Sequence, residues 1–205
     1  MPKVLITAYG PYDEWDQNAS WLVLQELTRN LPAGHDITTR RYQVDFDEVK
    51  QQLAEDLASG FDVALHLGQA PGAAAILLEA FGVNVRRDRG QAGCEATTLI
   101  DDGPPAFRSE LPLEAWATAL REAGILADVS FHAGDYLCNA AIYLSHYYSQ
   151  QAGQHTRATF VHLPLDSSQA LNYHKPIASL PAQVSAEAIR MMLATLPSTE
   201  TEGLA

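Results

Sequence analysis

The chain has 205 residues, of which 47% are hydrophobic and 19% charged, and this length and composition suit one globular domain with a large core. Its formal net charge of -12 argues against nucleic acid or an anionic membrane as a partner. No apolar run reaches the roughly 18 residues of a membrane span, and no signal peptide is visible, so we expect a cytoplasmic protein. Two cysteines, Cys94 and Cys138, are too few for a disulfide framework, although a single bridge between them stays open.

Strand and helix patterns alternate along the chain. Apolar runs predict strands over 3–9, 37–44, 61–68, 128–132 and 157–164. After a first helix that follows Asn18, caps and apolar spacing predict helices from Asp45 to about Gly60, Pro112 to Ala123, Leu137 to Gln151 and Ser185 to Leu196. The segments 86–105 and 166–184 are expected to be irregular. This alternation predicts an α/β fold with a largely parallel sheet in one domain, residues 1–196, followed by a mobile tail, residues 197–205.

Two stretches carry more specific expectations. The first helix, capped by Asn18 or Ser20, is expected to place Leu24, Leu27 and Leu31 on one buried face. The apolar run over 73–85 contains one charged residue, and its periodicity does not decide between helix and strand. As a strand it would align Leu77, Glu79, Phe81 and Val83 on one face, where a buried carboxylate needs a hydrogen-bonded partner.

Cys138 lies where a strand pattern ends and a helical pattern begins. At a helix N-terminus, unpaired backbone N–H groups and the helix dipole favour a thiolate over a thiol. The same N–H groups could hold an oxyanion that forms when the sulfur attacks a carbonyl group. The alternative is that Cys138 is a small buried hydrophobic residue, as most free cysteines are.

His162, near the end of a predicted strand, and Glu79 complete a candidate mechanism with Cys138. In it, the imidazole takes the thiol proton and the carboxylate orients the imidazole. Among the other histidines, His66 and His132 are interpreted as core or near-core residues, whereas the surface set comprises His35, His146, His155 and His174. No zinc-binding histidine pair occurs, so we expect neither a metal nor a cofactor.

Several blocks, in this order, resemble the pyroglutamyl-peptidase I family of cysteine peptidases. They are Thr7-Ala8-Tyr9-Gly10-Pro11-Tyr12, Asn18-Ala19-Ser20-Trp21, His66-Leu67-Gly68-Gln69-Ala70, Leu78-Glu79 with Asn84 and Arg89, Asp102-Gly103-Pro104, Ala133-Gly134-Asp135-Tyr136-Leu137-Cys138-Asn139 and Phe160-Val161-His162-Leu163-Pro164. The resemblance implies an α/β/α sandwich with a mostly parallel, mixed sheet. Many bacterial members are tetramers and some members are monomers, so the resemblance leaves both a homo-oligomer and a monomer open.

By this resemblance the protein is a cysteine ω-peptidase that hydrolyses the amide bond after an N-terminal pyroglutamyl (5-oxoproline) residue through a thioester. The implied catalytic residues are Cys138 as nucleophile, His162 as base and Glu79 as orienting acid. Arg89 matches a family arginine near the reaction centre. The implied substrate pocket comprises Tyr9, Tyr12, Tyr136 and Leu137 as walls and the backbone around Gln69.

Departures from the family pattern leave two alternatives open. The family commonly has phenylalanine at the positions of Tyr9 and Tyr12, and the two extra hydroxyls need partners or water if they face the pocket. The segment from Arg86 to Gly93 also differs from the usual acidic pattern. One alternative is a related thiol amidase acting on another small acyl or lactam group, and the other is a non-enzymatic binding protein with the same fold.

Overall fold

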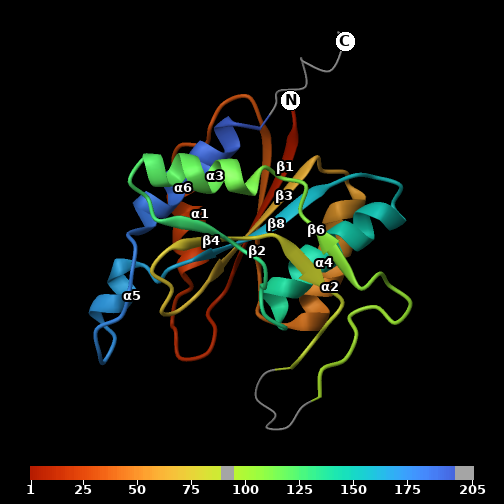
Figure 1. Cartoon of the computed structure of the whole chain (residues 1–205), viewed down its shortest axis with the longest axis horizontal. Helices are drawn as coiled ribbons and strands as arrows, with labels where there is room; N and C mark the ends of the chain where they lie inside the picture. The colour runs from red at the N-terminus through yellow and green to blue at the C-terminus, as the bar shows by residue number, and fades with distance from the viewer. Residues whose placement is uncertain (89–94, 197–205) are drawn as a thin grey trace.

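The computed structural model describes residues 1–88 and 95–196, and its centre is a six-stranded mixed sheet (Figure 1). In spatial order the strands are β2 (Asp36–Tyr42), β1 (Lys3–Tyr9), β3 (Val63–Gln69), β8 (Arg157–Leu163), β4 (Ile76–Glu79) and β7 (Ala127–Ser130). The first four are mutually parallel, whereas β4 runs antiparallel to β8 and parallel to β7. Of the predicted features, Arg89, Cys94 and the tail 197–205 lie outside the described residues.

Helices cover both faces of this sheet (Figure 1). On one face lie α1 (Ala19–Thr28), α3 (Leu113–Glu122) and α6 (Ala182–Ala194), and on the other lie α2 (Phe46–Ala58) and α4 (Leu137–Gln151). Two short strands, β5 (Phe81–Val83) and β6 (Ala106–Arg108), pair antiparallel beside α4, and α5 (Ser167–Leu171) is a single short helix. The expected single-domain α/β sandwich with a mostly parallel, mixed sheet is confirmed.

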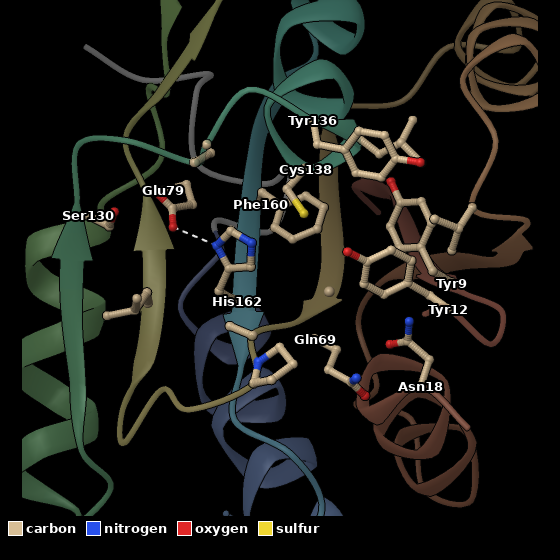
Figure 2. A pocket seen from close by; sticks show the side chains of 18 of the residues that line it. Tyr9, Tyr12, Asn18, Gln69, Glu79, Ser130, Tyr136, Cys138, Phe160 and His162 are labelled. Atoms are coloured by element: carbon tan, nitrogen blue, oxygen red, sulfur yellow. Dashed lines mark hydrogen bonds and ion pairs between the residues drawn. The ribbon is translucent and has the colours of Figure 1, made fainter. Parts of the chain in front are cut away.

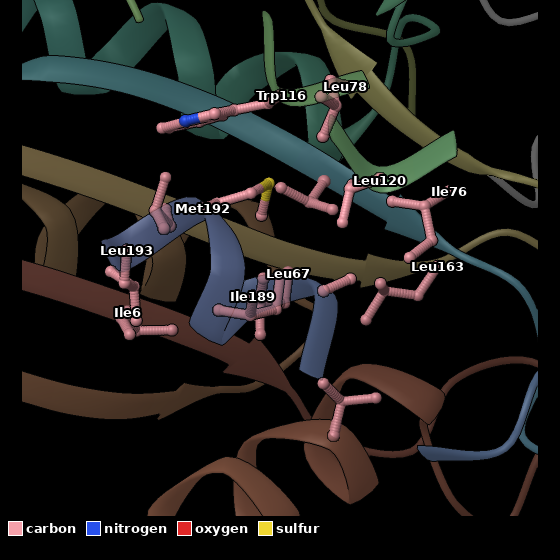
Figure 3. Close-up of a cluster of buried hydrophobic side chains, with 14 of the residues drawn as sticks. Ile6, Leu67, Ile76, Leu78, Trp116, Leu120, Leu163, Ile189, Met192 and Leu193 are labelled. Carbon is pink, nitrogen blue, oxygen red and sulfur yellow. The ribbon is translucent and has the colours of Figure 1, made fainter. Parts of the chain in front are cut away.

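The face under α1, α3 and α6 is packed almost entirely with apolar side chains. Figure 3 shows side chains of two helices and four strands meeting in this cluster: Ile6, Leu67, Ile76, Leu78, Trp116, Leu120, Leu163, Ile189, Met192 and Leu193. Each is at most 2% exposed, so their burial contributes much of the hydrophobic stabilisation of the fold. This apolar layer packs against the face of the sheet opposite α2 and α4.

Close backbone contacts set the position of α4 on the other face. A Cβ atom at Gly82 would lie 2.5 Å from the backbone nitrogen of Tyr143, so only glycine lets β5 approach α4 this closely. A Cβ atom at Gly68 would lie 2.2 Å from the ring of Phe160, so the absence of a side chain there lets this ring lie against β3. Both glycines bring the elements of the site together.

The sequence left helix or strand open for 73–85, and the structure has two strands there, Ile76–Glu79 and Phe81–Val83, in different sheets. The chain leaves the main sheet at Ala80, and β5 then pairs with β6. The backbone N–H of Ala80 still donates to Ser130, while its carbonyl accepts from the N–H of Ser109, so this residue joins the two sheets. Only Leu77 and Glu79 therefore share the expected face of the main sheet.

The predicted limits of the two outer helices need correction. The first helix ends at Thr28, and Leu31 lies beyond it with 39% of its surface exposed, because the following proline disfavours a helical conformation at that residue. The last helix begins at Ala182 rather than at Ser185, which is buried within it. A carboxylate oxygen of Asp166 accepts a hydrogen bond from the N–H of Ala182 at 2.6 Å, so the cap comes from a distant residue.

The segment 166–184 is less irregular than predicted. It contains α5, whose N-terminus has a capping box formed by Asp166 and Gln169. A helix of five residues is too short for a clear apolar period, so the pattern on which the prediction depended was absent. None of the helices in the described ranges is both long and apolar enough to cross a membrane.

Candidate active site

The site lies where the parallel part of the sheet meets its antiparallel edge. His162 is the penultimate residue of β8, and Leu77 of β4 is its antiparallel partner. Glu79 follows two residues later on the same face of β4, and such diagonal neighbours lie within reach of long side chains. Its Oε1 atom is 2.7 Å from Nδ1 of His162.

Glu79 is a buried carboxylate whose ionic partner is His162. The side chain is 1% exposed, and its second oxygen, Oε2, has no hydrogen-bond partner among the described residues. The hydroxyl of Thr159 donates to the backbone carbonyl of Glu79 at 2.8 Å and ties β4 to β8 at this point. Since an isolated buried carboxylate is costly, the contact with His162 supplies the partner that the sequence demanded.

Cys138 is the second residue of α4, as the sequence predicts. The N-cap residue, Tyr136, has an extended backbone and no side-chain capping bond, and Ala140 is the first residue to donate within the helix. Within the described residues, the N–H groups of 137–139 show no hydrogen-bond acceptor. The first turn thus offers unpaired donors and the positive end of the helix dipole beside the sulfur.

Asn139, which the sequence analysis did not single out, anchors this first turn. Its amide oxygen accepts from the N–H of Val83 at 2.8 Å, and its amide nitrogen donates to the carbonyls of Val83 and Val85, each at 2.9 Å. The side chain is fully buried. In the sequence, the only indication of this anchoring role was an asparagine next to the cysteine. Its partners, Val83 and Val85, lie more than 50 positions away, so no local pattern pointed to the contact.

A second polar contact holds α4 against the sheet. The ring of His66 lies between the hydroxyls of Thr7 and Ser145, with both contacts at 2.8 Å. Burial, with a smaller effect of His146, lowers the pKa of His66 to about 3, so this histidine is neutral at physiological pH. The prediction of a hydrogen-bonded core residue is confirmed for His66.

Two other histidine predictions are wrong. His132 is exposed because it follows the end of β7, two residues after Ser130, rather than lying within the strand. His146 was expected at the surface, but it is 7% exposed because its ring stacks on Phe107 with centroids 5.5 Å apart. The exposure of His132 depends on where β7 ends, and the burial of His146 depends on Phe107 of β6. Neither feature was predicted from the sequence.

The surroundings of His162 favour its protonated form. Burial lowers its pKa, but the negative charge of the Cys138 thiolate, the hydrogen bond to that sulfur and the contact with Glu79 outweigh burial and raise the pKa to about 10. Figure 2 shows the sulfur of Cys138 beside the imidazole, on the side away from Glu79. The arrangement therefore favours a proton on His162, beside the sulfur of Cys138.

These residues line a cavity of about 440 Å³. Every predicted site residue that the structure describes lines it: Tyr9, Tyr12, Gln69, Glu79, Tyr136, Leu137, Cys138 and His162. Figure 2 shows the tyrosines on one side of the cavity and the pair of Glu79 and His162 on the other. The sequence analysis did not include Asn18 or Phe160 among the pocket residues, although both lie in quoted blocks. Arg89 lies outside the described residues.

The tyrosine wall is mainly apolar but carries a buried hydroxyl. The rings of Tyr12 and Tyr136 have centroids 6.4 Å apart, and Tyr9 lies 6.1 Å from Phe160. Tyr9 is 4% exposed, and within the part of the chain that the structure describes its hydroxyl has no hydrogen-bond partner. Burial and, to a smaller extent, the charge of the Cys138 thiolate raise the pKa of Tyr9 well above its usual range, so the hydroxyl stays protonated.

A thiol, an imidazole and a buried carboxylate in one cavity of an α/β protein form the set of groups that cysteine-dependent hydrolases use. The same cavity supplies helix N–H groups for an oxyanion and a mainly apolar wall for a small acyl group. Across residues 1–88 and 95–196, no group of three or more His, Cys, Asp or Glu side chains is placed to hold a metal ion.

Comparison with known proteins identifies the family. The pyroglutamyl peptidase family model matches residues 2–198, so the chain belongs to this family. The pyrrolidone-carboxylate peptidase of Clavibacter michiganensis is 35% identical over 182 residues, which cover 86% of this chain and 84% of that protein. The corresponding peptidase of Streptomyces coelicolor is 33% identical over 98% of this chain and 95% of its own.

Solved structures agree with this assignment. The pyrrolidone carboxyl peptidase of Fervidobacterium islandicum superposes with a TM-score of 0.87 at 30% identity, over 94% of this chain and 97% of its own. A mutant pyrrolidone carboxyl peptidase of Pyrococcus furiosus gives a TM-score of 0.86 at 28% identity, over 94% and 96% of the two chains. The family and fold expected from the sequence blocks are therefore confirmed.

Proposed function

We propose that this protein is a cysteine peptidase that removes an N-terminal pyroglutamyl residue from peptides, with Cys138, His162 and Glu79 as its catalytic groups. The observation that carries this proposal is the 2.7 Å contact between buried Glu79 and His162, in the cavity that also contains Cys138. Membership of the pyroglutamyl peptidase family and the names of the relatives support the substrate class.

In the first half of the reaction, the Cys138 thiolate attacks the carbonyl carbon of the pyroglutamyl residue. The new carbon–sulfur bond moves an electron pair onto the carbonyl oxygen, and the N–H groups at the start of α4 lie where they can stabilise that oxyanion. Protonated His162 then gives its proton to the peptide nitrogen as the carbon–nitrogen bond breaks. Glu79 stabilises the imidazolium before this transfer and keeps the ring oriented after it.

In the second half, water hydrolyses the thioester. Neutral His162 takes a proton from the water while the oxygen attacks the thioester carbonyl, and the carbon–sulfur bond then breaks. The products are free 5-oxoproline and the regenerated pair of Cys138 thiolate and protonated His162. The chain's own groups thus move every proton, and the reaction needs no external reductant or oxidant.

The cavity suits a small, flat and uncharged acyl group. Its tyrosine side offers aromatic faces, and the floor contributes apolar surface from Phe160 and Leu137, both at most 3% exposed. The charged ammonium group of an unblocked N-terminal residue would lose its hydration there. The buried carboxylate of Glu79 could not compensate for this loss, because it is already paired with His162. The uncharged lactam avoids that cost.

Hydrolysis of a fluorogenic pyroglutamyl amide by the reduced, full-length protein tests the proposal. We expect turnover of this substrate and none of the matching prolyl amide, whose ring nitrogen is charged. The control is Cys138→Ala, which should be inactive. Cleavage of another acyl amide in preference to pyroglutamyl would instead favour the related thiol amidase, and turnover by Cys138→Ala would refute the assigned nucleophile.

We also expect self-association. The edge strand β7 is flanked by two large apolar side chains, Leu126 and Phe131, that are each 65% exposed. Such residues on an open sheet edge are suited to an interface between copies of the chain. Light scattering during size-exclusion chromatography measures the assembly, and a monomer over the working concentration range would contradict this expectation.

A further inference from the structure

The open side of the active-site cavity carries an acidic side chain that is not paired with a cation. Three exposed residues line the cavity and form its rim: Asp13, Pro71 and His132. Two further carboxylates line the cavity, but both are engaged. Glu79 contacts His162, and Asp135 lies 3.1 Å from Nε of Arg87. Asp13 takes part in no ion pair within residues 1–88 and 95–196, so its charge is available to an occupant of the cavity.

Asp13 is held in a tight turn with an unusual backbone. The N–H of Trp15 donates to the carbonyl of Tyr12 at 3.1 Å, and the N–H of Tyr12 donates to the carbonyl of Trp15 at 3.4 Å. Asp13 and Glu14 are therefore the two central residues of a hairpin turn. The φ angle of Asp13 is 56°, and among the described residues no other residue except glycine has a positive φ. A costly conformation kept beside an active site points to a role there.

The turn is anchored just beyond the end of α5. The rings of Trp15 and Tyr173 stack with centroids 4.9 Å apart, and the Tyr173 hydroxyl donates to Oε1 of Glu14 at 3.2 Å. Glu14 and Asp16 line a separate hollow beside α5 rather than the active-site cavity. Asp13 is therefore the one acidic residue of this turn that borders the active-site cavity, and the anchors keep it there.

The rim meets the part of the substrate that leaves. In the proposed reaction the scissile carbonyl lies at Cys138, the acyl ring occupies the enclosed part of the cavity, and the remaining peptide extends through the open side. Figure 2 shows Tyr12, the residue before Asp13, on the other side of the cavity from His162. Because the pyroglutamyl ring is uncharged, the first charge that a substrate can bring to the rim belongs to the residue after the scissile bond.

We propose that Asp13 is a specificity-determining residue that favours substrates with a lysine or arginine directly after the pyroglutamyl residue and disfavours those with an aspartate or glutamate there. This inference rests on the proposed function, because it takes the open side of the cavity to hold the leaving peptide. Asp13 is exposed, so attraction and repulsion should each change kcat/KM by only about twofold to fivefold.

Hydrolysis of three pyroglutamyl dipeptide amides, with lysine, alanine or glutamate as the second residue, tests the proposal. Release of the amine is followed at about pH 8, where an ordinary histidine is neutral. In the wild type, kcat/KM should decrease from lysine to alanine to glutamate, with a ratio of lysine to glutamate of about 5 to 20. This ratio should shrink in about 0.5 M salt, which screens exposed charges. Equal kcat/KM for the lysine and glutamate substrates would overturn the proposal.

Asp13→Asn is the decisive variant, because it removes the charge, keeps the shape and adopts the left-handed conformation readily. The ratio of lysine to glutamate should fall about threefold to tenfold, while kcat/KM for the alanine substrate stays within about twofold of the wild type. A ratio that does not change would contradict the role of Asp13.

Asp36→Asn is the matched control, since it makes the same charge change at an exposed residue. Asp36 begins β2, at the edge of the sheet opposite to the one that carries His162. The control should keep the ratio of the wild type. The same fall in both variants would mean that the net charge of the chain sets the preference, and would overturn the assignment to Asp13.

A second measurement reads the charge of the rim without any hydrolysis. Cys138 is modified with a cationic trimethylammonium methanethiosulfonate and, separately, with an anionic sulfonate methanethiosulfonate, and each rate is read at that residue by peptide mass mapping. The ratio of cation to anion rates should fall about twofold or more in Asp13→Asn and stay unchanged in Asp36→Asn. Such selectivity without hydrolysis of any pyroglutamyl amide would contradict the proposed function but support the charge role of Asp13. Hydrolysis without a charge preference would support the function and overturn this inference.

Discussion

The two faces of the central sheet are built from different kinds of side chain. Under α3 and α6 the buried cluster of described residues is aliphatic apart from one tryptophan, and it contains none of the proposed catalytic groups. Under α4, buried polar side chains cross from helix to strand: the ring of His66 contacts Ser145, and Asn139 binds the backbone of Val83. The site is on this second face.

The difference shows how stability and geometry are divided in this molecule. Hydrophobic burial has no direction, so the apolar face stabilises the fold without specifying the position of any one atom. Hydrogen bonds are directional and lose strength when bent, so the polar face also determines where α4 begins. We therefore expect changes on the two faces to have separable effects on stability and activity.

The largest effect should come from removing the thiol. Cys138→Ala deletes the proposed nucleophile without touching the hydrogen bonds that hold α4, so kcat/KM should fall by at least about 10⁴-fold while the thermal midpoint stays close to that of the wild type. Steady-state kinetics and circular dichroism measure the two quantities. A large loss of stability in this variant would show that the polar face does not separate the two roles.

Glu79→Gln should slow turnover by about 10²- to 10⁴-fold, because a neutral amide no longer stabilises the imidazolium. The charge and hydrogen bond of Glu79 contribute to the raised pKa of His162, so the alkaline limb of the kcat/KM profile should move to lower pH in the variant. A full pH profile measures this shift. An unchanged alkaline limb would contradict the role of Glu79 in holding the proton on His162.

On the apolar face, Leu120→Ala should destabilise the protein by about 2–5 kcal/mol, because it opens a cavity at a side chain that is 1% exposed. Denaturant unfolding measures the cost. At a temperature where the variant is folded, kcat and KM should match the wild type. A changed KM here would show that the apolar layer also shapes the site.

The smallest effect concerns pH and stability. His66 has a pKa of about 3 in the folded protein and takes up a proton near pH 6.5 when unfolded, so its contribution to stability is complete above pH 6.5 and is lost as the pH falls toward 3. Between pH 7 and pH 5 this loss is about 2 kcal/mol. His66→Gln should remove that part of the pH dependence in denaturant titrations, and an unchanged slope would contradict a neutral buried ring.

Elements with their own local signals were predictable from the sequence. The cysteine helix was expected to begin at Leu137 and end near Gln151, and it does. The first strand over 3–9 also has the expected limits. Apolar periodicity and turn residues act over a few neighbouring positions, so no knowledge of the rest of the fold was needed.

Features that depend on distant partners escaped sequence analysis. The break after Glu79 depends on β6, which pairs with β5 and where no strand was predicted. The start of α6 depends on the Asp166 cap, and Asn139 binds groups far along the chain. None of these contacts leaves a period or a motif in the residues around it.

The sequence by itself determined which candidate catalytic groups the protein carries and that its chain alternates strands and helices, because residue type and local pattern suffice for both. Only the tertiary structure decided which atoms meet. Glu79 contacts His162 across 83 residues, and Gln169 donates a hydrogen bond to Gln69 across 100 residues. Such pairs form where β8 meets β4 and where α5 returns to the end of β3, since folding brings side chains together in space whatever their separation along the chain.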